Sequence, residues 1–372
     1  MSRIDELIRE RCPDGVPYRS VGSLASVGTG SSDRKDAVED GAYPFYVRSK
    51  EVLRKDSYEF DEEAILIPGE GGVGDIFHYV NGKYALHQRA YRLAFKTDEV
   101  VAKYAYYYFC ANFKKFILAR AVNATVTSIR KPMLTDFLIA IPPPEVQGEI
   151  VRILDLFTSL EAELKAELAK RRQQYAHYRD ALFTFPDPGG VRWATMGEVA
   201  VNLDARRRPV TKSAREPGDI PYYGASGIVD YVSDYIFDGD FLLVSEDGAN
   251  LLTRSTPIAF TASGKTWINN HAHVLEFGTY IERRFVEIYL NSIDLSSYVS
   301  GGAQPKLNQA NLNRIPVPQP EFVEQERIVG IIDKLDALVN DLHSGLPAEI
   351  DARRQQYEYY RDKLLTFEEA VA

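Results

Sequence analysis

The sequence RRQQYAHYRDALFTF, from Arg171 to Phe185, returns almost unchanged as RRQQYEYYRDKLLTF, from Arg353 to Phe367. Similarity at a constant offset, here 182 residues, is the mark of an internal repeat. Further matches lie upstream. GVPYRSVGSL at 15–24 corresponds to GVRWATMGEV at 190–199, EEAILIPGEGG at 62–72 to GDFLLVSEDGA at 239–249, GKYALHQRAYRLAF at 82–95 to GKTWINNHAHVLEF at 264–277, and IAIPPPEVQGEI at 139–150 to NRIPVPQPEFVEQERI at 313–328. The pattern indicates a tandem duplication of the whole chain.

The composition predicts a soluble globular protein with two domains. A chain of 372 residues exceeds the usual size of a single core. Hydrophobic residues make up 45% and charged residues 26%, and no apolar run approaches the roughly 20 residues that cross a membrane. The start, MSRIDELIRERCPDG, is too polar for a secretory signal. Two cysteines, Cys12 and Cys110, support neither a disulfide framework nor a cysteine-based zinc site, so we expect a cytoplasmic protein.

The net charge of −9 argues against a uniformly basic nucleic-acid binder. Lys and Arg number 17 against 15 Asp and Glu over residues 16–140, and 12 against 14 over residues 190–319. The acidic excess lies in residues 320–372, with 6 basic and 12 acidic side chains. A nucleic-acid surface is therefore compatible with the two near-neutral segments, and the acidic segment belongs to something else.

Each half combines short strands with one helix, followed by a long helical segment. Runs such as AILIP, FLLVS, AYRLAF and HVLEF are separated by Gly, Asn and Asp, which favours short strands joined by turns. One helix interrupts them in each half, over EVVAKYAYYYFCANFKKFIL and IERRFVEIYLNSI. The prolines of IPPPE and IPVPQPE then end the strand pattern. The sequence predicts an α+β fold with a small curved sheet in each half.

Apolar residues spaced by three and four continue through both long helical segments. In the first copy they are Ile150, Ile153, Phe157, Leu160 and Leu164, followed by Tyr175, Tyr178, Leu182 and Phe185. In the second they are Ile328, Ile331, Leu335, Leu338 and Leu342, followed by Ile350, Tyr357, Tyr360, Leu364 and Phe367. Such a stripe predicts a coiled-coil seam with the tyrosines in its core. Gly345 and Pro347 predict a break in the second copy, with Pro347 in the first turn after it.

Connectivity sets the direction of the two helices. The first helix carries the chain from the first domain to the second, and the second helix begins at the second domain. If their stripes face each other, the helices are antiparallel, with a domain at each end. A helix of about 40 residues is about 60 Å long. RIDELIRE at the N-terminus resembles the helix end YRDALFTF, which precedes the second GV, so we expect the two chain ends to meet.

These features together resemble the specificity subunit of type I restriction-modification systems. The resemblance covers essentially the full chain. It rests on the openings DGVPY and GGVRW, the closings IPPPEVQGEI and IPVPQPEFVEQERI, and the two copies of RRQQY. GGAQPKLNQANLNRIPVP is close to the family's usual lead-in, whereas NATVTSIRKPMLTDFLIAIPPP in the first half lacks Gly-Gly-x-Gln-Pro and departs from it.

The resemblance implies a non-catalytic DNA reader with two pseudo-twofold-related target-recognition domains, each addressing one half of a bipartite, asymmetric sequence. Long antiparallel helices would fix the spacer and hold two methyltransferase subunits, which supply S-adenosylmethionine and methylate a flipped adenine. Restriction subunits would add ATP- and Mg²⁺-dependent cleavage, and this chain itself would carry no cofactor. The expected segments are a recognition domain at 1–143, a spacer helix at 144–186, a second recognition domain at 187–319 and a second spacer helix at 320–372.

Base-edge contacts should come from polar loops at matching places in the two halves. In the first domain the candidates are Arg48, Ser49, Lys50, His87, Gln88, Arg89, Asn123, Thr125, Thr127, Arg130 and Lys131. In the second they are Arg206, Arg207, Arg208, Ser226, Lys265, Asn269, Asn270, His271, Gln304, Lys306, Asn308 and Gln309. Solvated turns are the plainer alternative for any one residue. The recurrence of three loops with different side chains favours recognition.

The repeated helix phrase is the candidate partner surface. Charged residues on an exposed helix are usually only solvated. Here the whole phrase is kept while other parts of the two halves have drifted, which indicates an external constraint on both copies. The candidates are Arg171, Arg172, Gln174 and Arg179, with Arg353, Arg354, Gln356 and Arg361.

Other motifs carry less weight. The triplet Gly264, Lys265 and Thr266 resembles the end of a phosphate loop, but Ala259 stands where that motif needs Gly. His271 and His273 lack a third metal ligand nearby in sequence. Neither an Asn-Pro-Pro-Tyr methyltransferase motif nor a convincing nuclease carboxylate cluster is present. Two alternatives stay open: a protein-binding scaffold, which would lack the steep salt dependence of DNA binding, and a stand-alone methyltransferase, which would bind S-adenosylmethionine.

Overall fold

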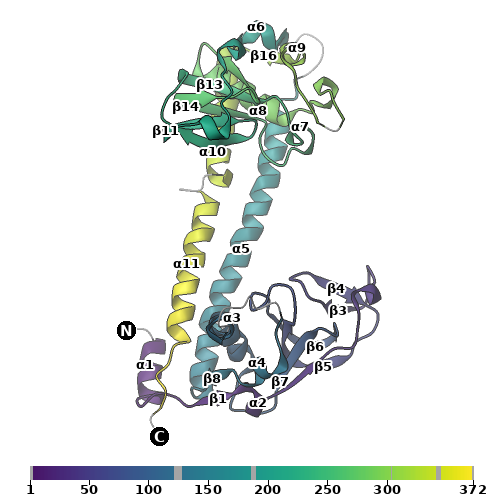
Figure 1. Cartoon of the computed structure of the whole chain (residues 1–372), viewed down its shortest axis with the longest axis vertical. Helices are drawn as coiled ribbons and strands as arrows, with labels where there is room; N and C mark the ends of the chain where they lie inside the picture. The colour runs from purple at the N-terminus through teal and green to yellow at the C-terminus, as the bar shows by residue number, and fades with distance from the viewer. Residues whose placement is uncertain (1–2, 121–127, 186–189, 303, 341–344, 371–372) are drawn as a thin grey trace. The chain divides into compact units, whose positions relative to one another are not determined.

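A computed structural model of the chain describes residues 3–120, 128–185, 190–302, 304–340 and 345–370 (Figure 1). It contains two compact units. Unit 1 comprises Met1–Lys165 and Glu349–Ala372, and unit 2 comprises Ala166–Ala348. Both combine helices with a sheet, which confirms the predicted α+β class. None of the helices in the described ranges has the length and apolar character that crossing a membrane would require.

Unit 1 is built on a six-stranded sheet in the order β2-β7-β5-β6-β3-β4. Its pairings are antiparallel, except that β3 and β6 are parallel. β1 and β8 form a separate antiparallel pair. The strands are β1 (Tyr18–Ser20), β2 (Ala25–Thr29), β3 (Tyr43–Tyr46), β4 (Val52–Lys55), β5 (Phe60–Pro68), β6 (His78–Leu86), β7 (Ala90–Phe95) and β8 (Leu138–Ala140). The shorter helices are α1 (Arg3–Arg11), α2 (Val21–Leu24), η1 (Arg34–Asp36), α3 (Ala102–Arg120) and α4 (Lys131–Thr135).

Unit 2 repeats this topology strand for strand, in the order β10-β15-β13-β14-β11-β12. β11 and β14 are parallel, as β3 and β6 are, and β9 pairs with β16. The strands are β9 (Arg192–Thr195), β10 (Val201–Asn202), β11 (Pro217–Gly224), β12 (Gly227–Val232), β13 (Phe237–Ser245), β14 (Ala259–Ile268), β15 (Ala272–Glu276) and β16 (Pro316–Gln319). The shorter helices are α6 (Met196–Val199), η2 (Asp204–Arg206), η3 (Lys212–Ala214), α7 (Asn250–Thr253), α8 (Tyr280–Ser292), η4 (Ser296–Tyr298) and α9 (Gln309–Asn313). The shared strand order confirms the tandem duplication.

The central strand of each sheet is buried on both faces. In β5, Ile65 and Ile67 pack into the cluster that contains α3, whereas Ala64 and Leu66 pack into a second cluster with Tyr84. In β13, Leu242 and Val244 alternate in the same way with Phe241 and Leu243. Successive side chains of a strand point to opposite faces. Burial on both faces therefore explains why AILIP and FLLVS are continuous apolar runs instead of alternating ones.

The first spacer segment forms one helix, whereas the second forms two. They are α5 (Pro144–Leu182, 39 residues), α10 (Phe322–Asn340) and α11 (Leu346–Leu364). Pro347 stands in the first turn of α11, as the sequence predicted. In unit 1, α11 lies alongside the start of α5 and runs in the opposite direction (Figure 1), with the Phe157 ring 6.4 Å from Tyr357 and 5.6 Å from Tyr360.

One aspartate at the corresponding place in each spacer segment binds the helix of its own unit. Asp155 of α5 accepts hydrogen bonds from Lys103 Nζ at 2.8 Å and from the Tyr107 hydroxyl at 2.6 Å, both on α3. Asp333 of α10 accepts one from Arg284 Nε of α8 at 2.8 Å. These contacts fix the start of each spacer segment to its sheet domain.

The apolar stripe is less buried than the sequence predicted. Tyr175 and Tyr357 are half-buried, but Tyr178 and Tyr360 are 46% and 41% exposed. The prediction that all four are core residues is therefore wrong for Tyr178 and Tyr360. A seam residue is buried only where neighbouring chain covers it on several sides, and a phenol ring is stable with one edge in water. Leu342 lies outside the described residues. The buried residues of α5 are Val146, Gln147, Glu149, Ile150 and Leu154.

The two chain ends meet in unit 1, as expected. Val16 N–H donates to the Glu368 carbonyl at 2.9 Å, and Ala370 N–H donates to the Val16 carbonyl at 3.0 Å. The Tyr18 hydroxyl donates to the Phe367 carbonyl at 2.9 Å. The segment after α11 thus pairs with the segment that opens unit 1.

This closure predicts an unusual sensitivity at Gly15. Its φ is +86°, and a Cβ there would lie 2.7 Å from the Glu368 carbonyl oxygen, whereas Gly82, at φ +114°, has open space around it. Gly82→Ala should cost about 1–2 kcal/mol through its backbone alone. Gly15→Ala should cost about 1–3 kcal/mol more because of crowding. Urea unfolding of the full chain followed by circular dichroism would compare them, and equal losses would contradict the packed closure.

Candidate nucleic-acid interface

The loops after β3, β5 and β6 meet at one edge of unit 1. Because β3 and β6 are parallel neighbours, both end at the same edge of the sheet. β5 ends with Pro68 opposite Ala90, the first residue of β7, so its loop joins the group. A fourth segment is tied in by the Ile129 N–H, which donates to the Gly69 carbonyl at 2.7 Å. Residues distant in sequence therefore form one loop group.

Glu70 lies at the centre of this loop group. Its Oε2 accepts hydrogen bonds from Arg89 Nη1 at 3.0 Å and from Arg48 Nη1 at 3.1 Å. The hydrogen bond from Arg89, followed by the bond from Arg48, holds the pKa of the Glu70 carboxyl below its ordinary value. The three side chains are 41–58% exposed, so solvent screens their pairing and it contributes little to stability. Two guanidinium groups against one carboxylate leave a net positive charge.

A hollow of about 180 Å³ opens beside Glu70, and the candidates Gln88, Arg89 and Arg130 line it. Gln88 Nε2 donates to Asp33 Oδ2 at 3.0 Å. His87 is buried beneath, where its Nδ1 accepts the Arg89 backbone N–H at 3.0 Å. Burial, with the nearby Arg48 charge, lowers the pKa of His87, so this ring is neutral at pH 7. The hollow thus presents polar side chains on a fixed backbone.

Unit 2 has the same loop group with different side chains. Asp247 corresponds to Glu70 and His271 to Arg89 in the repeat, and His271 Nδ1 lies 2.7 Å from Asp247 Oδ2. The Leu307 N–H donates to the Glu246 carbonyl at 2.8 Å, as Ile129 does to Gly69. Glu70 and Asp247 were not among the candidates from the sequence. An acidic residue at the same repeat position in both halves was the signal that would have found them.

A buried ionic cluster beneath the unit 2 loops was also missed. Atoms of Asp204, Glu246 and His273 lie within 4.8 Å of one another, a donor set that suits a metal ion. Arg207 already occupies it, however, at 2.6 Å from Glu246 and 3.3 Å from Asp204. His273 places Nδ1 2.6 Å from Asp204 and Nε2 2.7 Å from the Leu307 carbonyl oxygen, so neither ring nitrogen faces an open position. The cluster forms a packed set of ion pairs.

The electrostatics of this cluster follow from its pairing. Burial alone would raise the pKa of Asp204, but the hydrogen bond and charge of His273 outweigh it and hold that pKa below its ordinary value. Glu246 behaves in the same way through Arg207 and its other cationic neighbours. In unit 1 the corresponding positions hold Thr29, Gly69 and Tyr91, which line the hollow described above. Of the two units, unit 2 therefore has an ionic cluster at these positions, whereas unit 1 has uncharged residues around a hollow.

The structure places two of the DNA-contact candidates inside unit 2. The Arg207 side chain is 13% exposed and is held by the ionic cluster. Asn269 is buried, and its Oδ1 accepts the His271 backbone N–H at 2.8 Å. Both side chains hold the loops in place and face away from solvent.

The remaining candidates lie at several places. Lys265 Nζ and Arg206 Cζ each lie 4.7 Å from an aromatic centroid, of Tyr235 and Phe237 respectively. Asn308 caps α9 by accepting the Asn311 N–H at 2.9 Å. Exposed candidates are Lys50, Lys131, Arg208, Ser226, Asn270, Gln304, Lys306 and Gln309, and Ser49 is half-buried. Asn123, Thr125 and Thr127 lie outside the described residues.

The repeated helix phrase presents the same pairs in both units. In each copy the first arginine donates to the glutamine three residues on, and the last arginine pairs with the next aspartate. The pairs are Arg171–Gln174 (2.9 Å), Arg353–Gln356 (3.3 Å), Arg179–Asp180 (2.9 Å) and Arg361–Asp362 (2.9 Å). Arg172 and Arg354 are exposed. Arg179 also borders a hollow of about 550 Å³ with Tyr175 and Arg284.

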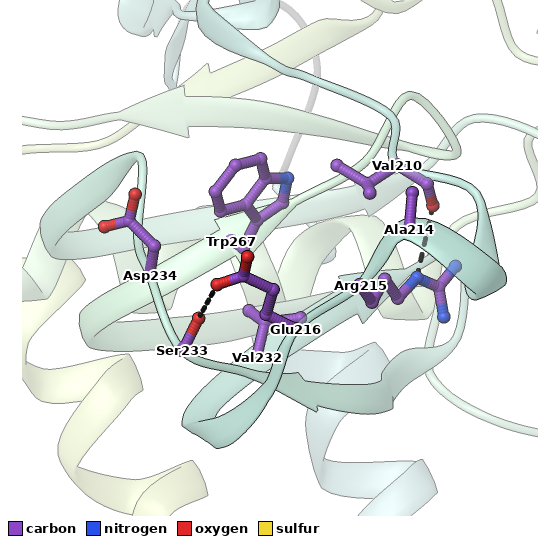
Figure 2. A pocket seen from close by; sticks show the side chains of 8 residues that line it. All are labelled: Val210, Ala214, Arg215, Glu216, Val232, Ser233, Asp234 and Trp267. Atoms are coloured by element: carbon purple, nitrogen blue, oxygen red, sulfur yellow. Dashed lines mark hydrogen bonds between the residues drawn. The ribbon is translucent and has the colours of Figure 1, made fainter.

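A further hollow in unit 2, of about 220 Å³, has a different character (Figure 2). Its lining cation, Arg215, donates to the Val210 carbonyl at 3.1 Å and to Asp230 at 2.9 Å. Glu216 accepts from the Ser233 hydroxyl at 3.3 Å. The full lining is Val210, Ala214, Arg215, Glu216, Val232, Ser233, Asp234 and Trp267. Two carboxylates and a paired arginine do not suit a DNA phosphate.

Comparison with known proteins gives a consistent picture. The family model "Type I restriction modification DNA specificity domain" matches twice, over residues 13–170 and 190–352. A putative type I restriction enzyme specificity subunit of Haemophilus influenzae is 40% identical over 183 residues, which cover 48% of this chain and 47% of that protein. A type I restriction enzyme specificity subunit of Escherichia coli is 33% identical over 255 residues, covering 62% and 63%. The chain thus matches about half to two thirds of these relatives' length.

The fold has solved counterparts. A crystal structure of a type I restriction-modification system S subunit from M. genitalium superposes with a TM-score of 0.63 at 18% identity, covering 94% of this chain and 96% of that one. A chain from a study of complex assembly and conformational transition in the type I system gives 0.59 at 14% identity, covering 95% and 98%. At this identity the likeness concerns the fold alone.

Arg207 and Arg208 are neighbours in sequence, but only Arg207 is buried, so their substitutions should have different effects on stability. Arg207→Ala should destabilise unit 2 by about 1–3 kcal/mol. It removes the buried guanidinium that pairs with both carboxylates, while His273 stays beside Asp204 and Lys306 beside Glu246. Arg208→Ala, one residue on and exposed, should change stability by less than about 0.5 kcal/mol. The chain's two tryptophans, Trp193 and Trp267, both lie in unit 2, so urea unfolding followed by tryptophan fluorescence reports on this unit. Equal stability of the two variants would contradict the buried cluster.

Proposed function

Because this chain belongs to the type I restriction-modification DNA specificity family, we propose that it is the DNA-recognition subunit of such a complex and that each unit reads one half of a bipartite target. Members of this family are recognition components and not catalysts, so the chain itself is not an enzyme. The half-sites differ in sequence, since the two units differ in their reading side chains. The chain acts on cytoplasmic DNA.

The observation that carries this proposal is the pair of matching loop groups. The same strands, in the same order, bring four loops to the same edge of each sheet. The backbone contacts are repeated, whereas the exposed chemistry is not: Glu70 with Arg89 in unit 1, and Asp247 with His271 in unit 2. Sequence is read by side chains on base edges, and a shared scaffold with different side chains suits an asymmetric target.

The spacer helices set the distance between half-sites and bind the partner subunits. Support comes from the Arg and Gln residues of the repeated phrase, which keep the same internal pairs in both copies. Two methyltransferase subunits supply S-adenosylmethionine, and restriction subunits supply ATP- and Mg²⁺-dependent cleavage. With a net charge of −9, the lone chain binds DNA weakly, and its partners provide much of the phosphate clamp.

Exchange of one recognition unit tests the assignment. Replacing residues 190–312 with the equivalent segment of a relative should change one half of the recognised sequence and leave the other half and the spacer unaltered. The readout is the methylated motif in genomic DNA of a host that carries the complete system. A change in both half-sites would refute independent reading by the two units.

A matched change in the helix provides the control. Inserting four residues, roughly 6 Å of helix, between Leu160 and Lys170 should alter the spacer and leave both half-sites as they were. If the chain were instead a protein-binding scaffold, neither change would move a DNA motif. Its binding would also lack the linear fall of log affinity with log salt that phosphate contacts produce.

A further inference from the structure

We propose that Arg89 reads a guanine in the half-site of unit 1, with Glu70 as its positioning residue, and that the corresponding pair His271 and Asp247 gives unit 2 a different base preference. This inference rests on the proposed function and adds to it the base and the residue. It is based on the contacts that hold Arg89 beside Glu70 and His271 beside Asp247.

The main chain of Arg89 is held on both sides. Its N–H donates to His87 Nδ1 at 3.0 Å, and its carbonyl accepts the Gly69 N–H at 2.8 Å. A Cβ on Gly69 would lie 2.8 Å from that carbonyl oxygen, so only glycine allows this approach without a shift. The turn from β6 to β7 therefore presents the Arg89 side chain from a fixed point, which base reading requires.

The Arg89 side chain is exposed and is held at only one atom. Nη1 donates to Glu70 Oε2, and the side chain is 58% exposed. A guanidinium has five N–H donors. Among the residues that the structure describes, the others have no partner. Glu70 is held in turn by Arg48, which donates to the same oxygen. The carboxylate thus anchors the guanidinium at Nη1 and leaves its other donors for a ligand.

The geometry favours a base over a phosphate. A planar guanidinium fork matches the O6 and N7 acceptors of guanine, and this is the commonest specific contact in the major groove. A phosphate contact needs charge but no fixed plane, and a neighbouring carboxylate weakens it. Glu70 therefore has a clear role with a base reader and none with a phosphate contact. It also contributes almost nothing to stability as an exposed pair.

Unit 2 places a different group at the same point. His271 Nδ1 faces Asp247 Oδ2 at 2.7 Å, which leaves one ring nitrogen for a ligand. One nitrogen cannot make the paired contact to O6 and N7 that a guanidinium edge makes. The two units therefore distinguish different bases at equivalent positions of their half-sites.

The test is selection from randomised DNA duplexes by the assembled complex of this chain with its methyltransferase subunits. The unit 1 half-site is the one that persists when residues 190–312 are exchanged. It should contain a guanine at which other bases lower binding by about 10- to 100-fold. Arg89→Ala and Arg89→Lys should both reduce that ratio to a few-fold at this position only. His271→Ala is the matched control and should affect only the other half-site.

The positioning role of Glu70 has its own readout. Glu70→Gln should relax preference at the same base as Arg89→Ala while the thermal midpoint stays at the wild-type value. Glu70→Asp, which keeps the charge, should recover part of the preference. A purely structural residue would move the midpoint and leave the preference of bound DNA unchanged, and that result would overturn the role given to Glu70.

Two outcomes overturn the reading by Arg89. One is equal weakening on every sequence with a salt slope reduced by about one and rescue by Arg89→Lys, which marks a phosphate contact. The other is an unchanged preference at every position. Both leave the proposed function standing, because the wild-type complex would still select a bipartite motif. A wild-type complex that selects no motif would refute the proposed function and this inference with it.

Discussion

One parallel strand pair in each sheet determines where the loop groups lie. The pair is β3 with β6 in unit 1 and β11 with β14 in unit 2, and the other pairings in both sheets are antiparallel. Phe45 pairs with Ala85 in unit 1, and Tyr222 pairs with Trp267 in unit 2. Parallel neighbours end at the same edge, so the loops that follow them meet there. The central strand, β5 in unit 1 and β13 in unit 2, ends beside the first residue of β7 or β15. The loop that follows the central strand therefore joins the same group. Loops that are as far apart in sequence as Arg48 and Ile129 thereby become one surface.

The two units support that surface by different means. Unit 1 has Thr29, Gly69 and Tyr91 around a hollow, whereas unit 2 fills the corresponding place with Arg207 and its acidic partners. Buried ion pairs pay a large desolvation penalty and add little net stability, but removing one partner is strongly destabilising. A rigid frame with variable loops is the usual way in which one fold serves different ligands.

The spacer helices combine burial at their starts with exposure farther along. α5 buries Ile150 and Leu154 where it leaves the recognition domain, and Asp155 binds α3 there. Farther on, Tyr178 is exposed and the repeated arginines pair mostly with neighbours on the same helix. Such local pairs are worth only a few tenths of a kcal/mol, so stability does not explain why the phrase occurs twice.

The sequence by itself determined that the chain is a tandem duplication of an α+β unit. It also determined which segments form strands and which form helices, and that a helix restarts with Pro347 in its first turn. Those features depend on local periodicity, on proline geometry and on comparison of the chain with itself. Only the tertiary structure showed that Arg207 and Asn269 point inward, that Tyr178 is exposed, and that Glu70 and Asp247 are the centres of the loop groups. Whether a side chain is buried or paired depends on residues far away in the chain that the order of the strands brings next to it. The local sequence around a residue does not show which distant residues those are.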